Sequence, residues 1–282
     1  MNVKLPFLVS VLTVLISCHK QTADPNGPPE DPVNPHSFIA LKLTDISIDG
    51  LPAPYYHFDY LDDRHISDLN FGNGLLYKMT YAGDNLTLMK NNTANTSEDS
   101  VLYNYINNRV TSIYVTTDSG FLYHRAFLTY FASGQLQKLE WELKQADQAF
   151  ANEQSFTFTY YPDGNVKEIM HQYFAIGSLP AASFTDRYEN YDTQKNTDGF
   201  TLVHASINQY KHPILLPGII LQVNNPGRVV RSGNAAVDYE VNYVYRYDAK
   251  DRPLEKTGDF LYTSGPEAGQ HDEVLTHFSY HD

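Results

Sequence analysis

The chain has 282 residues, of which 42% are hydrophobic and 13% aromatic, and its formal net charge is −13. This acidity argues against nucleic acid as a partner, because phosphate binding needs a basic surface. It favours solubility instead. The composition includes 22 tyrosines against one tryptophan and four methionines. Such tyrosine usage fits β-structure with half-wet faces, or a surface that recognises a partner.

The N-terminal residues have the pattern of a secretory signal. Lys4 precedes an apolar run from Leu5 to Ser17, which is shorter than the roughly 20 residues that a membrane-spanning helix needs. The run ends in "LISC", and Cys18 is the only cysteine of the chain. The alternative is an ordinary signal with an incidental buried cysteine. However, no A-x-A-like cleavage site follows, and a lone cysteine cannot form an internal disulfide.

The stretch "LISC" resembles the lipobox of bacterial lipoproteins, with a leucine three residues before the cysteine and a small residue just before it. The resemblance implies that residues 1–17 are a lipoprotein signal peptide and that Cys18 is the lipidated first residue of the mature chain. Several acyl chains on one cysteine are enough for stable membrane anchoring. His19, at a position where aspartate signals inner-membrane retention, implies the outer membrane of a Gram-negative bacterium.

Residues 18–37 are predicted to form a proline-rich tether, with prolines at positions 25, 28, 29, 32 and 35. Proline favours extended, unpaired backbone, so at about 3.1 Å per residue the tether spans about 50 Å. Acidic residues in it resemble the tags that move some lipoproteins to the cell exterior, so a periplasmic and a surface-exposed location both stay open. Residues 38–282 are then expected to form one β-domain, a common size for all-β folds.

This domain contains a repeated unit: an apolar residue, any residue, a tyrosine, a polar turn and a return segment. The repeat tyrosines are Tyr60, Tyr81, Tyr105, Tyr130, Tyr160, Tyr247 and Tyr280. Alternation at period two predicts half-buried strands, and Gly, Asp and Asn between them predict short hairpin turns. In four units the return segment reads apolar-x-x-apolar, as in Ile66/Leu69 and Val166/Ile169. This three-residue step predicts a β-bulge after each turn.

These units, of which "YDAKDRPLEK" keeps the Tyr-Asp pair, resemble the YD repeats of large secreted shells such as teneurins and bacterial toxins. The arrangement also resembles a family of bacterial lipoproteins of unknown function described as having a porin-like fold. The fold prediction is all-β: an antiparallel up-and-down meander of about seven YD-like hairpins in one strongly curved or barrel-like sheet. Such a meander places short turns on one rim and longer connections on the other.

The repeat fails in an irregular insertion at about residues 192–238. This insertion contains "HPILLPGIILQVNNPG", an apolar run interrupted by proline and glycine. We expect the run to pack against the concave side of the sheet or to plug an open end, with an apolar ligand pocket along Ile214–Leu221 as the alternative. A membrane-embedded barrel is not expected, because Arg125 interrupts the apolar band that a lipid face requires.

No catalytic or metal site is predicted. His271, His277 and His281 alternate along one segment, but strand spacing separates them too widely to share one ion, so no metal or cofactor is expected. The conspicuous carboxylates lie at hairpin tips, where aspartate bonds the turn backbone. They are Asp59, Asp62, Asp63, Asp163, Asp248 and Asp251. A polysaccharide-acting enzyme that uses such loop carboxylates is kept as an alternative.

The predicted ligand-binding residues are aromatic: Trp141, Tyr173, Tyr55 and Tyr56. Their rings offer platforms for sugars or for protein side chains. Trp141 follows Leu139 at spacing two, which equally fits a core residue. The leading functional prediction is a non-enzymatic, lipid-anchored module of the envelope or cell surface that binds a glycan or protein through its long-loop rim. A structural shell or transport accessory protein is a further alternative.

Overall fold

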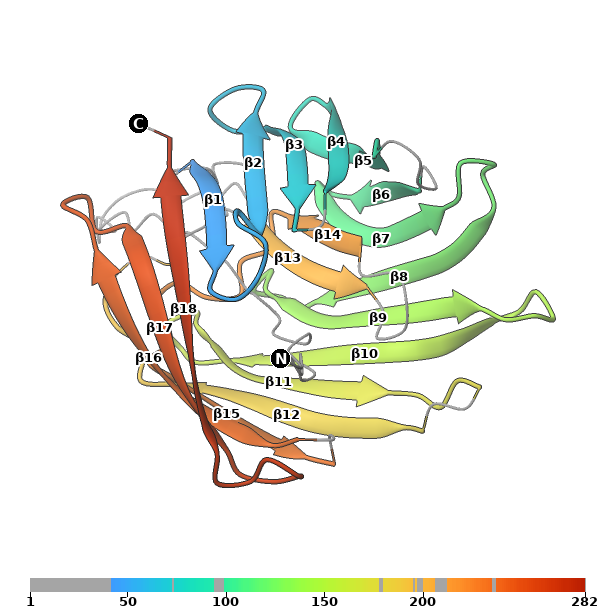
Figure 1. The fold of residues 1–282 in the computed structure, drawn as a ribbon. Helices are drawn as coiled ribbons and strands as arrows, with labels where there is room; N and C mark the ends of the chain where they lie inside the picture. Colours follow the sequence, from blue (N-terminus) through green and yellow to red (C-terminus); the bar gives the residue numbers. More distant parts are fainter. Residues whose placement is uncertain are drawn as a thin grey trace, which may run out of the picture.

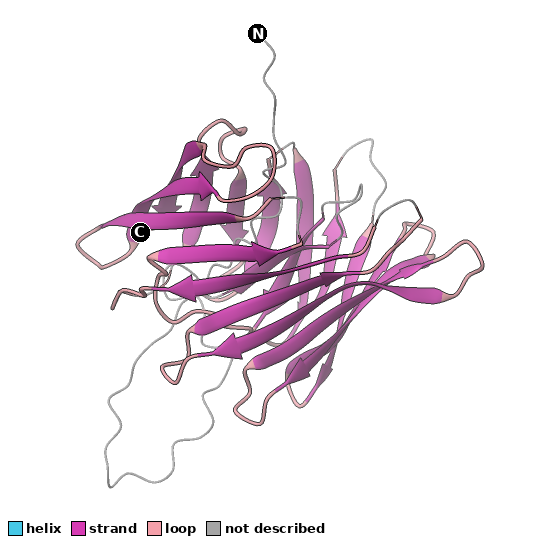
Figure 2. Ribbon diagram, turned by 90° about the horizontal axis from the view of Figure 1, so that it is seen from below, coloured by secondary structure: helices cyan, strands magenta, loops and turns pink. Residues whose placement is uncertain are grey.

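The computed structural model describes residues 42–72, 74–93, 99–177, 180–194, 196, 200–205, 212–234 and 237–281. The predicted signal peptide, Cys18 and the tether lie outside these residues. The described elements are all strands, as Figure 2 shows. Within the described ranges, no helix is long and apolar enough to cross a membrane.

Eighteen strands are present in the described part of the chain. In chain order they are β1 Leu43–Ile48, β2 Tyr56–Tyr60, β3 Ile66–Phe71, β4 Leu75–Ala82, β5 Asn85–Asn91, β6 Ser100–Ile106, β7 Arg109–Thr116, β8 Leu122–Tyr130, β9 Leu136–Lys144, β10 Phe150–Tyr160, β11 Val166–Tyr173, β12 Ala182–Glu189, β13 Phe200–Ala205, β14 His212–Pro217, β15 Arg228–Gly233, β16 Tyr239–Tyr247, β17 Pro253–Tyr262 and β18 His271–Tyr280.

Sixteen of these strands form a closed antiparallel barrel (Figure 1). Neighbours in the barrel are neighbours in the chain except at two places, where β12 pairs with β15 and β1 pairs with β18. The predicted up-and-down meander in a barrel-like sheet is therefore confirmed. Six hairpins with tight turns, together with the pairs β12–β15 and β18–β1, make eight two-stranded units. About seven hairpins were expected.

The barrel has two different rims. The tight-turn rim carries the turns at 61–65, 83–84, 107–108, 131–135, 161–165 and 248–252, together with the insertion between β12 and β15. The long-loop rim carries the remaining connections, which are more variable in length, including 49–55, 117–121, 145–149 and 263–270. Connections such as 49–55 and 263–270 are longer than the turns of the opposite rim, as expected, whereas 117–121 and 145–149 have five residues, the same length as the turn at 131–135.

A bulge follows each tight turn, as the apolar-x-x-apolar step predicted. In the first hairpin Asp59 pairs with Asp68 and Tyr60 with Ile66, so the return strand carries one extra residue. The same shift occurs at Tyr81, Tyr105, Tyr130, Tyr160 and Tyr247. Every such bulge thus lies opposite a repeat tyrosine, and bulges increase local twist and bend a sheet toward closure.

The repeat tyrosines connect each hairpin to the one before it. The hydroxyl of Tyr81 donates to the carbonyl of Ile66 at 2.9 Å, and that of Tyr130 donates to the carbonyl of Val110 at 2.6 Å. Eight tyrosines make this type of bond: Tyr60, Tyr81, Tyr105, Tyr130, Tyr160, Tyr191, Tyr245 and Tyr280. We call this set the tyrosine ring; its members at β2, β4, β6, β8 and β10 each face a bulge.

The tyrosine ring also spans the junction between the two ends of the barrel. Tyr280 of β18 pairs with Leu43 of β1, and the carbonyl of Leu43 accepts the hydroxyl of Tyr60 at 2.7 Å. The regular sequence of bonds is interrupted only beside the insertion. There Tyr247, predicted as a repeat tyrosine, donates to Asp192, while Tyr245 donates to the carbonyl of Pro226 at 3.1 Å.

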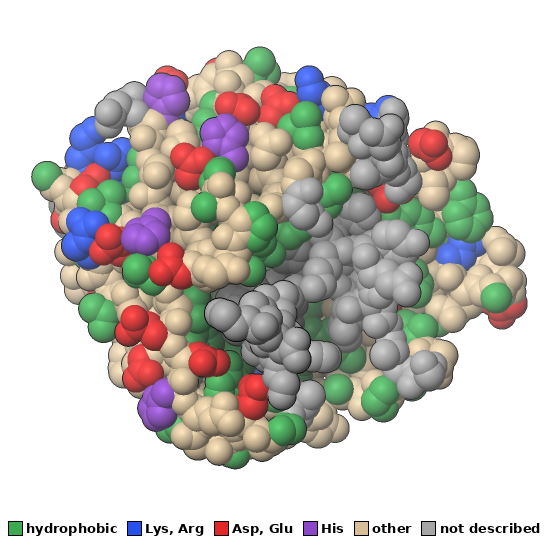
Figure 3. All heavy atoms as spheres, viewed as in Figure 1, with side chains coloured by type: hydrophobic (Ala, Val, Ile, Leu, Met, Phe, Trp, Pro, Cys, Tyr) green, Lys and Arg blue, Asp and Glu red, His purple; other side chains and the backbone are tan. Residues whose placement is uncertain are grey.

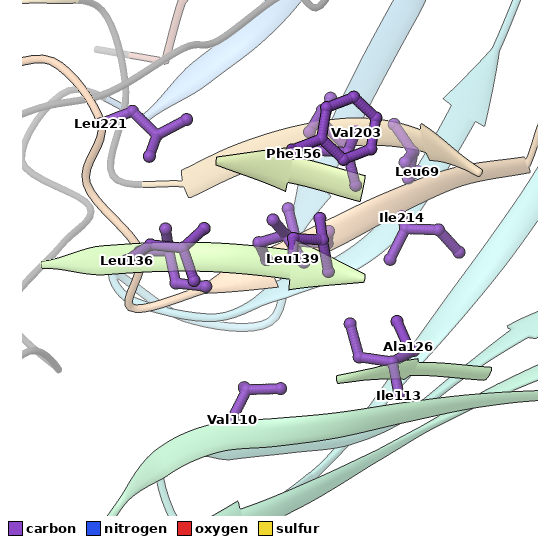
Figure 4. Close-up of a cluster of buried hydrophobic side chains, with 14 of the residues drawn as sticks. Leu69, Val110, Ile113, Ala126, Leu136, Leu139, Phe156, Val203, Ile214 and Leu221 are labelled. Carbon is purple, nitrogen blue, oxygen red and sulfur yellow. The ribbon is translucent and has the colours of Figure 1, made fainter. Parts of the chain in front are cut away.

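The interior of the barrel is filled by inward-facing side chains and by part of the insertion. Hairpin β13–β14 forms its own two-stranded sheet inside the ring of wall strands (Figure 1). Figure 4 shows Val203, Ile214 and Leu221 of the insertion among Leu69, Ile113, Leu139 and other side chains of the wall. All of these belong to one buried apolar cluster. The apolar run therefore packs on the concave side of the sheet.

The segment after β14 is fixed to the tight-turn rim by hydrogen bonds. Asn165, fully buried in the turn between β10 and β11, accepts the amides of Val223 and Asn224 at 2.7 and 2.8 Å through its side-chain carbonyl. The amide of Val166 donates to the carbonyl of Leu221 at 2.8 Å. Residues 228–233 of the predicted irregular segment are regular, because they form wall strand β15.

The outer face of the wall carries many charged and polar side chains beside exposed apolar ones such as Val244 and Met170. Neighbouring strands are joined by ion pairs such as Arg125 with Glu142 at 2.5 Å and Arg228 with Glu240 at 2.6 Å. A barrel embedded in lipid instead presents an apolar band outward and polar groups inward. In the described wall, the large apolar core cluster lies inside.

Removing one ring hydroxyl tests this arrangement. We expect Tyr130→Phe to lower the free energy of unfolding by about 1 kcal/mol, because the bond to Val110 is lost while the ring still packs on the core. Urea denaturation followed by fluorescence measures the change. Tyr114→Phe is the matched control, because Tyr114 lies on β7 between the buried residues Ile113 and Val115 and faces away from the core. It should leave the stability within about 0.5 kcal/mol of wild type. Equal stability of both variants would contradict a structural role for the bond.

Candidate functional site

Three of the four aromatic residues predicted to bind a ligand lie on the inner side of the wall: Trp141, Tyr173 and Tyr56. Trp141 on β9 has 0% exposure and contacts the ring of His124 at 4.6 Å. Tyr173 on β11 is 8% exposed and packs against Phe184 at 5.7 Å. The structure brings Trp141 and Tyr173 to opposite sides of Gln154, which pairs with both.

Tyr55 and Tyr56 form a separate group at the start of β2. Their ring centroids are 5.0 Å apart, and both rings contact Phe71. Tyr56 is fully buried, whereas Tyr55 is half-buried. These two tyrosines contribute to the core beneath the long-loop rim. Trp141, Tyr56 and Tyr173 are thus buried in the core. For Trp141, this is the alternative role that its spacing from Leu139 also fitted.

The interior contains a charged cluster formed by β11, β12 and β15. Arg231 binds Asp186 through two parallel hydrogen bonds of 2.7 Å each, from Nε and Nη2. The Nε2 atom of His171 lies 3.0 Å from Oδ2 of the same carboxylate. The ring of Phe184 stacks on His171 at 4.4 Å and lies 4.1 Å from the guanidinium carbon of Arg231. The cluster is thus enclosed by aromatic faces.

Electrostatics make this cluster a fixed ion pair. Burial raises the pKa of Asp186, but the hydrogen bonds and charges of Arg231 and His171 together outweigh that effect and hold the pKa below its usual range. Burial lowers the pKa of His171 despite the neighbouring carboxylate. Asp186 is therefore an ionised partner of Arg231, and His171 is neutral near pH 7. Both carboxylate oxygens are held by the guanidinium, which suits a structural counter-ion better than a general base.

A second polar group lies next to it on β8, β9 and β10. His124 and Glu153 approach to 2.6 Å, and both are buried. The indole nitrogen of Trp141 and the amide nitrogen of Gln154 have no hydrogen-bond partner among the described residues. Trp141 and Gln154 are directly paired across β9 and β10.

Three of the six carboxylates predicted at hairpin tips have the expected turn-forming role, whereas Asp59 lies within strand β2 and Asp63 pairs with Lys42. Asp62 accepts the amides of Arg64 and His65, at 2.7 and 2.9 Å. Asp163 accepts the amide of Asn165 at 3.0 Å, and Asp248 accepts that of Lys250 at 2.8 Å. These carboxylates stabilise turns.

The terminal histidines do not converge. His271 lies 3.2 Å from Asp259, and His277 lies 3.5 Å from Glu255. Figure 3 shows histidine and acidic side chains distributed over this side of the barrel. Within the described ranges, no group of three or more His, Cys, Asp or Glu residues is arranged to hold a metal ion.

One exposed and two half-buried aromatic rings lie next to cations toward the long-loop rim. Phe121 ends the loop between β7 and β8 and is 45% exposed; the Lys144 ammonium lies 4.3 Å from its ring centre. Phe150 begins β10, and the Arg125 guanidinium carbon lies 4.0 Å from its ring centre. Phe127 is 5.3 Å from the same guanidinium. We call Phe121, Arg125, Phe127, Lys144 and Phe150 the rim patch.

Sequence reasoning did not identify the rim patch. Phe121 and Phe150 come from connections more than 25 residues apart, and only the pairing of β8, β9 and β10 brings them together. The available signal was an aromatic residue at the end of each of two polar connections, "TTDSGF" and "KQADQAF". Aromatic rings in loops on a rigid scaffold are a frequent basis of binding.

Comparison with known proteins gives similarity at the level of fold. No protein-family model and no curated protein matches the sequence. The structure is similar to that of a porin-like protein from Bacteroides uniformis, with a TM-score of 0.52 and 8% identity over 80% of this chain and 89% of that chain. A TcdB2–TccC3–Cdc42 structure gives a TM-score of 0.30 and 13% identity, over 77% of this chain and 14% of that one. The chain therefore has a porin-like fold.

The buried histidine predicts how stability depends on pH. In the unfolded chain His171 has the ordinary pKa of 6.5, whereas the folded value is lower. Protons therefore bind preferentially to the unfolded state as the pH falls below that value, and stability decreases by up to about 1.4 kcal/mol per pH unit. Because the pKa of Asp186 is lower in the folded state than in the unfolded chain, its ionised carboxylate stabilises the fold. That stabilisation is lost at lower pH, as the carboxylate becomes protonated.

We expect His171→Phe, which keeps an aromatic ring against Phe184, to remove the first of these two losses. Its unfolding free energy should fall less steeply than that of wild type just below pH 6.5, as measured by urea denaturation across a pH series. Parallel curves for the two proteins would show that His171 does not titrate differently on folding.

Proposed function

We propose that the chain is a non-enzymatic β-repeat module of a bacterial cell envelope, attached through a lipidated Cys18, that binds an acidic glycan at the rim patch. The porin-like fold and the repeated tyrosine hairpins support a relation to YD-repeat lipoproteins of the outer membrane. The single observation that carries the binding role is the rim patch, in which the exposed ring of Phe121 lies beside the Lys144 ammonium and the half-buried ring of Phe150 lies beside Arg125, a residue also paired with Glu142.

The chemistry of the rim patch favours an acidic carbohydrate. The exposed ring of Phe121 offers an apolar surface for the C–H face of a sugar, and Lys144 beside it offers a cation for a carboxylate or sulfate group. Arg125, Phe127, Lys144 and Phe150 lie on strands of the closed barrel and Phe121 directly precedes β8, so little ordering entropy is lost on binding.

The arrangement of carboxylates supports binding without turnover. Glycoside hydrolysis needs two carboxyl groups facing one substrate, one of them free to donate a proton. At the tips, Asp62, Asp163 and Asp248 accept backbone amides. Inside the barrel, Asp186 is held by Arg231. These carboxylates have structural partners, and they lie on separate turns or in the core.

A glycan array tests the binding proposal. We expect labelled protein to bind acidic glycans saturably and without product release, and the double variant Phe121→Ser/Phe150→Ser to bind at least about tenfold more weakly, because both rings of the patch are lost. Phe131→Ser, an exposed phenylalanine on the tight-turn rim, is the matched control and should bind like wild type. Unchanged binding by the double variant, or release of shortened glycan, would refute the proposal.

The lipid anchor has its own test. Cells given a labelled fatty acid should incorporate it into the wild-type protein but not into Cys18→Ala, because Cys18 is the only cysteine that can carry the acyl groups. His19→Ala is the neighbouring control and should retain the label. Incorporation into Cys18→Ala, or its absence from wild type, would exclude lipidation at this residue.

A further inference from the structure

The tight-turn rim carries a row of apolar side chains. In five consecutive hairpins, from β2–β3 to β10–β11, the residue directly after the ring tyrosine is apolar or aromatic: Leu61, Ala82, Ile106, Phe131 and Tyr161. Leu61 is 69% exposed, Ile106 63% and Phe131 36%. Since neighbouring strands lie about 4.8 Å apart, consecutive hairpins place these residues about 10 Å from one another. We call this row the apolar arc.

The apolar arc occupies only part of the rim. Beyond the insertion, the corresponding positions after Tyr247 and Tyr280 are Asp248 and His281, and Asp192 follows Tyr191. Apolar residues scattered singly over a surface need no explanation, but a row of equivalent positions on one side of one rim does. Figure 1 shows the hairpins that carry the arc following one another around the barrel.

The turn itself does not require an apolar side chain at this position. The amides of Leu61 and Phe131 each donate to the carbonyl four residues later, His65 and Gln135, at 2.8 and 2.9 Å. The amide of Asp248 makes the same bond to the carbonyl of Arg252 at 2.9 Å. A polar residue therefore completes this turn equally well, and the exposed apolar side chains are not explained by local structure.

The chain enters the barrel beside the arc. Lys42 directly precedes β1, and its ammonium lies 2.5 Å from Asp63, in the turn that also carries Leu61. The carbonyl of Lys42 accepts the amide of His281 at 2.8 Å. Residues 1–41, including Cys18, thus connect to the barrel at the tight-turn rim.

We propose that the apolar arc rests on the surface of the lipid bilayer, so that the rim patch on the opposite rim points away from the membrane. The orientation rests on the proposed lipid attachment at Cys18, because the tether then reaches the membrane from the side of the arc. A few exposed side chains bind a bilayer weakly on their own. The anchor raises the effective concentration of the arc at the surface, so weak contact suffices.

The contact is apolar in origin. The same turns carry Asp62, Asp63 and Asp163, so the rim offers no excess positive charge for anionic lipids. Leucine, isoleucine and phenylalanine gain about 25 cal/mol per Å² of apolar surface removed from water, and tyrosine is suited to the interface. Binding to zwitterionic vesicles should therefore persist at high salt, where electrostatic attraction is screened.

An environment-sensitive fluorophore tests the contact independently of lipidation. The protein used is the chain from residue 18 to 282 with Cys18→Ala, which keeps every described element of the barrel. A nitrobenzoxadiazole label is placed at Ile106→Cys on the arc, or at Phe121→Cys on the opposite rim as the matched control. On addition of excess vesicles of phosphatidylcholine and phosphatidylethanolamine, the label at 106 should brighten and shift to the blue, and the label at 121 should not change.

The variant Leu61→Ser/Phe131→Ser, labelled at 106, should need at least about fivefold more lipid for half of the change. No response at 106, an equal response at 121, or an undiminished response in the Leu61→Ser/Phe131→Ser variant would each overturn the proposed contact. Because no acyl chain is present in this experiment, its failure is distinct from failure of fatty-acid incorporation at Cys18.

Discussion

The fold depends on a hydrogen bond in which a tyrosine hydroxyl of one hairpin donates to a carbonyl at the start of the return strand in the hairpin before it. The bulge opposite each repeat tyrosine lies at the residue that supplies this carbonyl, as Tyr60, Ile66 and Tyr81 show. At about 1 kcal/mol each, eight such bonds are comparable in size with the whole net stability of a domain. They also fix the order of the hairpins, because each bond joins two consecutive units.

Beside the insertion, residues of the insertion itself accept the tyrosine hydrogen bonds that a neighbouring hairpin accepts elsewhere. Tyr191 still donates to Val166, but β12 is followed by residues that enter the barrel rather than by a tight turn. Asn165 and Asp192 bind the returning segment at Asn224 and Asn225 before β15 rejoins the wall. The insertion thus contributes apolar side chains to the interior, and its residues Asn224 and Asn225 are hydrogen-bonded to the tight-turn rim. Packing of the insertion and closure of the wall are thus coupled.

Much of this architecture follows from local sequence. Period-two alternation gives the strands, and the apolar-x-x-apolar step gives the bulge, because both are set by residues within one hairpin. Asp163 could be assigned to its turn for the same reason. The role of Asn165 could not, because its partners Val223 and Asn224 are 58 and 59 residues away. Tyr245 and Tyr247 could not be distinguished, since their acceptors belong to the insertion.

The candidate site was harder to predict than the fold. Trp141, the one tryptophan, was predicted to bind a ligand, but its position on β9 directs the side chain inward, next to His124 and Gln154. Phe121 and Phe150 are ordinary residues in the sequence and become a patch only when β8, β9 and β10 are paired. The two rims then acquire different chemistry, with aromatic rings beside cations on one and the apolar arc on the other.

Closure of the wall between β1 and β18 is the central claim, because the tyrosine ring, the enclosed insertion and the opposed rims all require it. Ser47 and His277 are directly paired across that junction. In a chain with Cys18→Ala, we expect Ser47→Cys and His277→Cys to form a disulfide on mild oxidation, since paired residues lie within disulfide range. The pair Ser47→Cys and Ser279→Cys, offset along β18, should form it far more slowly. Absence of the first disulfide, or equal formation of both, would contradict a closed barrel in this register.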